Sequence, residues 1–193
     1  YQDIFGMIQN QTERLSHLSE VLLDMTGIQS IERSDSISLA ELADEVCCDL
    51  ASIADQKKVE LIQEEGDCTV TGSYLLLYRA VYNLVENAIK YNHSGGKVTV
   101  KISQKKDLPA AHSKPTDYAL VEVTDTGIGI SPEFQAKIFD PFFRVDKSRS
   151  RAMGGAGLGL ALVNEIARQH GGQVKVLASS EQGSTIALVL PLT

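Results

Sequence analysis

Two glycine-rich segments, at residues 125–130 and 154–160, constrain this chain more than any other feature. They read DTGIGI and GGAGLGL, and they follow the segment NLVENA at residues 83–88. Glycine tolerates positive φ and lets a ligand come close to main-chain N–H groups, which phosphate binding requires. One such segment alone would be a weak signal. Two in this order, behind an asparagine-bearing helix, make ATP the leading candidate for the ligand.

Composition narrows the class of protein. At 193 residues, one full domain with a small extra element is expected. The net charge of −7 argues against general affinity for nucleic acid or anionic membranes. Three cysteines without a CxxC pattern indicate neither a zinc site nor a disulfide framework, so we expect a reducing cytoplasmic setting. No apolar run approaches the roughly 20 residues of a membrane span, although the chain could be the inner portion of a membrane-anchored receptor.

Residues 4–25 carry apolar side chains in two columns with a seven-residue period. Such a stripe predicts a helix that must pack on partner helices, so we expect a homodimeric bundle. The columns are Ile8, Leu15 and Leu22, and Ile4, Leu18 and Met25. We place this helical unit at residues 1–29, a polar linker at 30–37 and the main domain at 38–193.

The main domain alternates helices with short strands, which predicts an α/β fold. Ser38, with Glu41 three residues later, forms a capping box for a helix that ends near Lys57. Ser73 is expected to cap a second helix, and a short helix should begin at residues 131–133. A further helix is predicted over 158–170, and residues 104–117 are interpreted as a variable hairpin loop. The predicted strands are 59–63, 68–71, 97–103, 119–124, 173–177 and 185–190.

Four segments resemble the ordered motifs of sensor histidine kinases of two-component systems. They are the asparagine box at 83–91, the first glycine box at 125–130, the phenylalanine box at 138–144 and the second glycine box at 155–160, and residues 183–185 fit the closing turn. The resemblance covers residue 38 to the C-terminus, and the helix at 4–26 looks like the second helix of the family's dimerisation hairpin.

This resemblance implies a Bergerat-type ATP-binding fold. Its architecture is an α+β sandwich, with a mixed sheet covered on one face by helices and a mobile lid over the nucleotide. It also implies transfer of the γ-phosphate of ATP to a histidine, and from there to an aspartate on a response-regulator receiver domain.

The first glycine box is expected to hold the base. Asp125 would accept a hydrogen bond from the adenine amino group, and this acceptor side chain would reject the guanine oxygen. Gly127 and Gly129 would let the chain turn closely past the base, with Ile130 closing the box. The plainer alternative for Asp125 is a surface Asp-Gly turn.

The asparagine box is expected to hold the metal and the phosphates. Asn87 would supply an amide oxygen to Mg²⁺, and Asn83 would support the triphosphate or a water. Lys90 would be a phosphate-directed cation, with a solvated helix-end lysine as the alternative. Tyr91 would cover the adenine face or pack in the core. Glu86, next to the metal-binding asparagine, is assigned an assisting role in transfer.

Asn83 also separates two kinds of chemistry. In the related gyrase, mismatch-repair and chaperone ATPases, a general-base glutamate stands four residues before the metal-binding asparagine. Because that position is Asn83 here, we expect slow hydrolysis and retention of the γ-phosphate for a protein acceptor. The catalytic set predicted by the resemblance is Asn83, Glu86, Lys90 and Arg144.

The lid and the second glycine box complete the predicted site. Arg144 matches the family position that reaches the phosphates, where a guanidinium fork suits phosphate oxygens. Phe142 is expected to pack under the lid or against the dimerisation helices. Backbone N–H groups at a helix start would face the phosphates, and Ala156 replaces the family's usual hydroxyl. The residues assigned here are Gly155, Ala156, Gly157, Leu158 and Gly159.

None of the four histidines has the context of a phosphoacceptor. They are His17, His93, His112 and His170, and the last is interpreted as a cation favoured by a helix C-terminus. We therefore interpret the chain as a fragment that binds ATP but cannot complete autophosphorylation alone. The alternatives are a non-catalytic nucleotide-binding regulatory module, a GHKL ATPase, and a serine kinase of the anti-sigma type.

Overall fold

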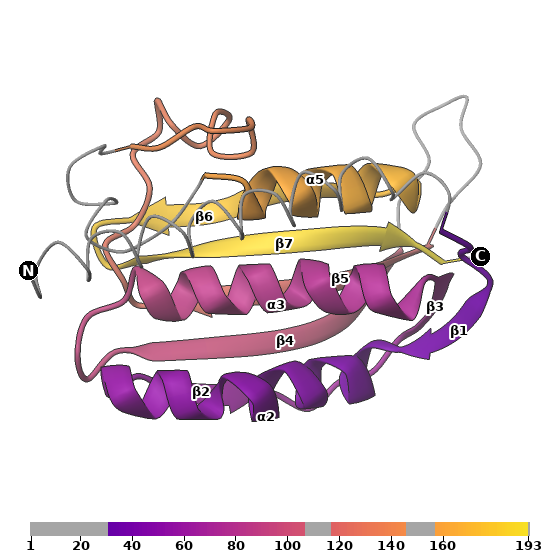
Figure 1. The fold of residues 1–193 in the computed structure, drawn as a ribbon, viewed down its shortest axis with the longest axis horizontal. Helices are drawn as coiled ribbons and strands as arrows, with labels where there is room; N and C mark the ends of the chain where they lie inside the picture. The colour runs from indigo at the N-terminus through magenta and orange to yellow at the C-terminus, as the bar shows by residue number, and fades with distance from the viewer. Residues whose placement is uncertain (1–30, 107–116, 146–156, 193) are drawn as a thin grey trace, which may run out of the picture.

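The described part of the chain is built on a five-stranded sheet with helices on one face, beside a small two-stranded sheet. The computed structural model describes residues 31–106, 117–145 and 157–192. Figure 1 shows the three helices side by side across the same face of the sheet. They are α2 (Leu39–Lys57), α3 (Tyr74–Lys90) and α5 (Gly159–Gln169). This layering confirms the predicted mixed sheet with one helical face, whereas the predicted helix at 4–26 lies outside the described residues.

The five-stranded sheet has the strand order β2-β4-β5-β7-β6. Strand β2 runs parallel to β4, and the other neighbours pair antiparallel. A parallel pair needs a crossover connection, and α3 supplies it. The strands are β2 (Glu60–Gln63), β4 (Lys97–Lys106), β5 (Asp117–Asp125), β6 (Gln173–Ser180) and β7 (Gly183–Pro191).

A separate two-stranded sheet joins the strand before the first helix to a strand that follows β2. Strands β1 (Asp35–Ser38) and β3 (Thr69–Gly72) pair antiparallel, so the predicted linker at 30–37 ends in a strand. The predicted cap at Ser38 is present, since its Oγ accepts the Glu41 N–H at 3.2 Å. Strand β1 was missed because four residues, read alone, resemble a polar linker.

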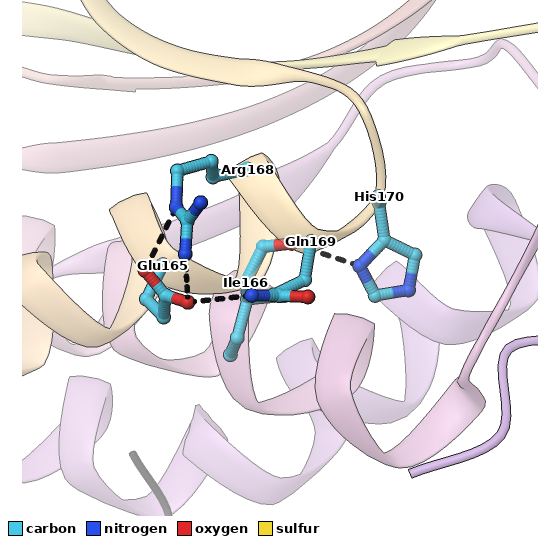
Figure 2. Close-up of polar contacts among 5 residues, drawn as sticks. All are labelled: Glu165, Ile166, Arg168, Gln169 and His170. Atoms are coloured by element: carbon cyan, nitrogen blue, oxygen red, sulfur yellow. Dashed lines mark hydrogen bonds and ion pairs between the residues drawn. The ribbon is translucent and has the colours of Figure 1, made fainter. Parts of the chain in front are cut away.

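The N-terminus of α3 is held differently from the prediction. The Ser73 side chain makes no capping hydrogen bond. Instead, the Ser73 N–H donates to Nε2 of His170 at 3.1 Å, and Nδ1 of that ring lies 2.8 Å from the Ile166 carbonyl (Figure 2). The imidazole therefore accepts at Nε2 and donates from Nδ1, and burial lowers its pKa. His170 is neutral in this arrangement, so the prediction of a helix-end cation is wrong.

The structure differs from two other local predictions. Residues 132–139 form hydrogen-bonded turns rather than a short helix, with bonds such as Ile138 N–H to the Phe134 carbonyl at 2.9 Å. Strands β4 and β5 extend into the predicted loop at 104–117, as far as Lys106 and from Asp117. Their cross-strand register is continuous over these ends, so pairing rather than local propensity sets the strand length.

One apolar core lies between the helices and the sheet. It contains fully buried leucines of α2 and α3, such as Leu42 and Leu77, and the inward-facing Val98 and Val100 of β4. Burying each such side chain contributes about 1.5–3 kcal/mol, so the core fixes α3 and α5 relative to the sheet. Within the described ranges, no helix is both long enough and apolar enough to cross a bilayer.

Candidate functional site

The asparagine box and the second glycine box meet where α5 begins. A Cβ placed on Gly159 would lie 2.5 Å from Oδ1 of Asn83 and 3.7 Å from Nδ2 of Asn87. The Asn83 amide nitrogen donates to the Arg79 carbonyl at 2.8 Å, which fixes the amide orientation. A side chain at position 159 would push the Asn83 amide aside, so two segments more than 70 residues apart in the sequence are in direct contact here.

The phenylalanine box lies against the same turn. The Phe142 N–H donates to the Gly157 carbonyl at 2.9 Å, and Gly157 has φ of +74°. A Cβ on Gly157 would lie 2.9 Å from the Phe143 carbonyl oxygen. Leu158 is buried, whereas Phe142 is 59% exposed. Gly155 and Ala156 lie outside the described residues, as do the cationic positions between 146 and 151.

Arg144 carries the clearest sign of an anion site. Its Nη2 is buried and has no hydrogen-bond partner among the described residues. A buried donor without a partner is unfavourable, and more so when it is charged. An anionic ligand such as a phosphate group would satisfy it, so the residues present fit the group that the glycine boxes predict.

Lys90 lies in the same electrostatic neighbourhood as Arg144. Burial lowers the pKa of Lys90, Glu86 opposes that change, and the positive charges of Lys57 and Arg144 add to it. The Lys90 ammonium is 5.9 Å from the centre of the Tyr91 ring. This end of α3 therefore gathers positive charge with one acidic neighbour.

Tyr91 joins α3 to the first glycine box. The Ile128 N–H donates to the Tyr91 carbonyl at 3.3 Å, and a Cβ on Gly127 would lie 2.5 Å from that carbonyl oxygen. Burial raises the pKa of the Tyr91 hydroxyl, and the nearby Arg144 charge opposes the change. The predicted motifs at 83–91 and 125–130 and the described part of the second glycine box, 157–160, thus meet around the C-terminal half of α3.

Asp125 is the last residue of β5 and is oriented by backbone donors. Its Oδ1 accepts the Gly127 N–H at 2.8 Å, and its carboxylate also accepts the backbone N–H of Ser184. Burial raises the pKa of Asp125, and these two hydrogen bonds oppose the rise. The carboxylate is therefore a fixed acceptor rather than part of a mobile surface turn.

The turn between β6 and β7 supports the first glycine box, a contact that the sequence reasoning missed. Gly129 has φ of +69°, and a Cβ there would lie 1.7 Å from the Ser180 carbonyl oxygen. The Ile130 N–H donates to Oγ of Ser179 at 2.7 Å. The only available signal was the serine-rich stretch before Gly183, which resembles any polar hairpin turn.

An open depression of about 510 Å³ borders the outer side of the first glycine box. Its lining consists of His93, Thr126, Gly127, Ile128, Glu181 and Gln182. This lining includes none of the predicted asparagines or cations. Among the described residues, no cluster of histidine, cysteine and carboxylate side chains could hold a metal ion. A Mg²⁺ ion would have to rely on amide and phosphate oxygens and water.

The fold and the site define a nucleotide-binding domain. Residues 72–193 match the family described as the histidine kinase-, DNA gyrase B-, and HSP90-like ATPases, and the chain belongs to that family. Within it, the chain has the features of the ATP-binding domain of sensor histidine kinases.

One relative by sequence and two structures of similar fold illustrate the similarity. The sensor-like histidine kinase SenX3 of Mycobacterium tuberculosis is 34% identical over 94% of this chain and 43% of its own length. The structure of full-length ShkA in complex with AMPPNP covers the whole chain with a TM-score of 0.77, at 23% identity and over 39% of that chain. Histidine kinase ThkA in complex with the response regulator TrrA covers 94% of this chain and 49% of its own, with a TM-score of 0.68 and 23% identity. The chain thus spans less than half of these proteins.

Proposed function

We propose that this chain is the catalytic ATP-binding part of a sensor histidine kinase. It would transfer the γ-phosphoryl group of ATP to a histidine on a dimerisation helix, for relay to an aspartate of a receiver domain. The name of SenX3, the binding of AMPPNP by ShkA and the complex of histidine kinase ThkA with a response regulator support this assignment. A homodimer through the helix at 1–29, the linker at 30–37 and a cytoplasmic place in a membrane-anchored receptor belong to the same proposal.

One observation carries the proposal. The buried Nη2 of Arg144 lacks a partner in the described chain, and Arg144 lies close enough to Lys90 to lower its pKa. Two cations near one another are unfavourable unless an anion lies between or beside them. A triphosphate would satisfy both, and the helix start at Gly159 adds backbone N–H groups that favour phosphate.

The remaining residues have separate roles in this proposal. Asp125 accepts a hydrogen bond from the adenine amino group. Asn87 contributes an amide oxygen to Mg²⁺, which would offset negative charge on the phosphates. Tyr91 flanks the base, and Asn83 supports the triphosphate. Glu86 would assist proton removal from the acceptor histidine.

Transfer of the γ-phosphoryl group is a nucleophilic displacement at phosphorus. The bond between the γ-phosphorus and the β–γ bridging oxygen breaks, and ADP leaves with its electron pair. A bond forms from an imidazole nitrogen to phosphorus, and the imidazole gives up its N–H proton. The described residues contribute charge neutralisation and orientation to this step, through Arg144, Lys90 and the backbone at Gly159.

Asn83 argues against ATP hydrolysis as the activity of this chain, because it stands where the hydrolytic members of the family have a general-base glutamate. Its amide nitrogen is already bonded to the Arg79 carbonyl, and an amide cannot take a proton from water at neutral pH. We therefore expect the chain alone to hydrolyse ATP slowly. Steady hydrolysis without an acceptor would favour the GHKL ATPase alternative instead.

The first test is Mg-ATP binding by calorimetry, comparing the chain with its Asp125→Asn variant. Asparagine has one acceptor oxygen for three donors, namely Gly127 N–H, Ser184 N–H and the adenine amino group. We expect affinity to fall about tenfold or more. The matched control is Asp117→Asn at the opposite end of β5, whose carboxylate accepts only a Gln104 amide among the described residues.

Transfer is tested next by adding a dimerisation hairpin that carries an acceptor histidine. Label from γ-phosphate on the hairpin supports the kinase assignment. Binding of ATP without transfer would favour the non-catalytic regulatory module. If the parent chain bound no ATP, the proposal of a nucleotide site would be wrong.

A further inference from the structure

Ser179, near the end of β6, bonds to two segments that both reach Asp125. Its Oγ accepts the Ile130 N–H at 2.7 Å. Its single proton has two acceptors within reach at the start of β7, the Ser184 Oγ at 3.3 Å and the Gly183 carbonyl at 3.5 Å. We propose that Ser179 is a positioning residue that sets the first glycine box and the Asp125 carboxylate relative to each other. This inference rests on the proposed function.

The two segments approach the carboxylate from different sides. On one side, the Gly127 N–H donates to Oδ1 of Asp125 at 2.8 Å, and Ile130 lies three residues further along the same turn. On the other side, the Ser184 backbone N–H donates to the same carboxylate, and its residue is 6% exposed. The Ser179 hydroxyl is hydrogen-bonded to both segments, so it links the two sides of the Asp125 carboxylate.

The local backbone explains why a side chain of β6 can do this. The pairing of β6 with β7 shifts register between Val176 and Ala178, and such bulges re-aim the side chains that follow. The first glycine box packs directly on this stretch, because Gly129 leaves no room for a Cβ beside the Ser180 carbonyl. In that contact the Ile130 N–H has the Ser179 hydroxyl as its acceptor.

The test compares Ser179→Ala with Ser179→Thr and Ser180→Ala. The threonine keeps the hydroxyl and suits a strand. Ser180→Ala is the matched control, because its Oγ accepts the Gln182 N–H within the same turn and makes no bond to the glycine box. Mg-ADP affinity is measured by calorimetry well below the thermal midpoint, where every variant is folded. Amide hydrogen exchange at Ile130 is measured without nucleotide.

We expect Ser179→Ala to bind Mg-ADP about tenfold more weakly and to lose exchange protection at Ile130. The other two variants should stay within about twofold of the parent. Unchanged ADP affinity in Ser179→Ala would overturn the inference, and so would equal losses in Ser179→Ala and Ser180→Ala, which would indicate a general weakening of the turn. A parent that binds no ADP would overturn the proposed function, and the inference with it.

Discussion

At the scale of single residues, replacing Arg144 should affect nucleotide affinity and folding stability in opposite directions. Its Nη2 is buried without a partner in the described chain, which is unfavourable until an anion arrives. In Arg144→Met, we expect the free energy of unfolding without nucleotide to stay unchanged or to rise by about 1 kcal/mol. ATP affinity should fall about tenfold or more, since charge-assisted hydrogen bonds are lost.

Denaturant unfolding and calorimetry on the same samples check this pair of effects. The control is Arg168→Met, which removes an exposed guanidinium bonded to Glu165 at 2.7 Å (Figure 2). A large loss of stability in Arg144→Met, without any loss of ATP affinity, would mean that Arg144 is a structural residue.

The protonation of His170 should make the folding stability depend on pH. Its folded-state pKa lies below the usual value of 6.5, because burial and the Arg33 charge outweigh the Ile166 carbonyl. The unfolded chain therefore binds a proton first, so this contribution to stability is complete above about pH 6.5 and is lost as pH falls toward the folded pKa. His170→Ala should lower stability by about 1–3 kcal/mol, because the Ser73 N–H loses its acceptor, and should flatten this pH dependence.

Urea unfolding between pH 5.5 and 8 measures this effect. The exposed His93, replaced by glutamine, is the control and should keep the parent's pH profile. An unchanged profile in His170→Ala would show that other groups set the dependence.

At the scale of elements, the glycine box and the β6–β7 turn behave as one unit. Gly129 and Gly95 both have positive φ, +69° and +82°. A Cβ on Gly129 would meet the Ser180 carbonyl at 1.7 Å, whereas nothing lies within 4 Å of a Cβ on Gly95. Gly95→Ala should therefore cost only about 1–2 kcal/mol of backbone strain.

Gly129→Ala should cost clearly more and should also weaken nucleotide binding, because the glycine box must move away from the turn. Thermal unfolding and calorimetry of both variants measure the difference. Equal stability losses with intact binding in both would show that packing at Gly129 is not needed by the site.

How far the sequence predicts these elements depends on how local their causes are. The helix at Ser38 and the glycine boxes were predictable, because caps and glycine positions act within a few residues. The neutral state of His170 was not, because its acceptor role depends on Ser73, nearly 100 residues away in the sequence. Ser179 was missed for the same reason, since its partner Ile130 lies on another element.

At the scale of the whole molecule, the site is built on the large core that joins α2, α3 and α5 to the sheet. A ligand that holds the end of α3 against the start of α5 should therefore stabilise the described domain as one cooperative unit. At about 100 times the dissociation constant, binding adds about 2.7 kcal/mol, which predicts a rise in thermal midpoint of roughly 5–10 °C for a chain of this size.

Scanning calorimetry with Mg-ADP, a ligand that cannot be consumed in the transfer reaction, measures this rise. Asp125→Asn should show about half of that shift or less at the same ADP concentration, because a tenfold weaker affinity lowers the stabilisation to about 1.4 kcal/mol. Asp117→Asn should shift like the parent. A transition that splits in two when ADP is added would indicate that the nucleotide stabilises only part of the domain, and that the asparagine and glycine boxes are less tightly coupled to the core than their packing implies.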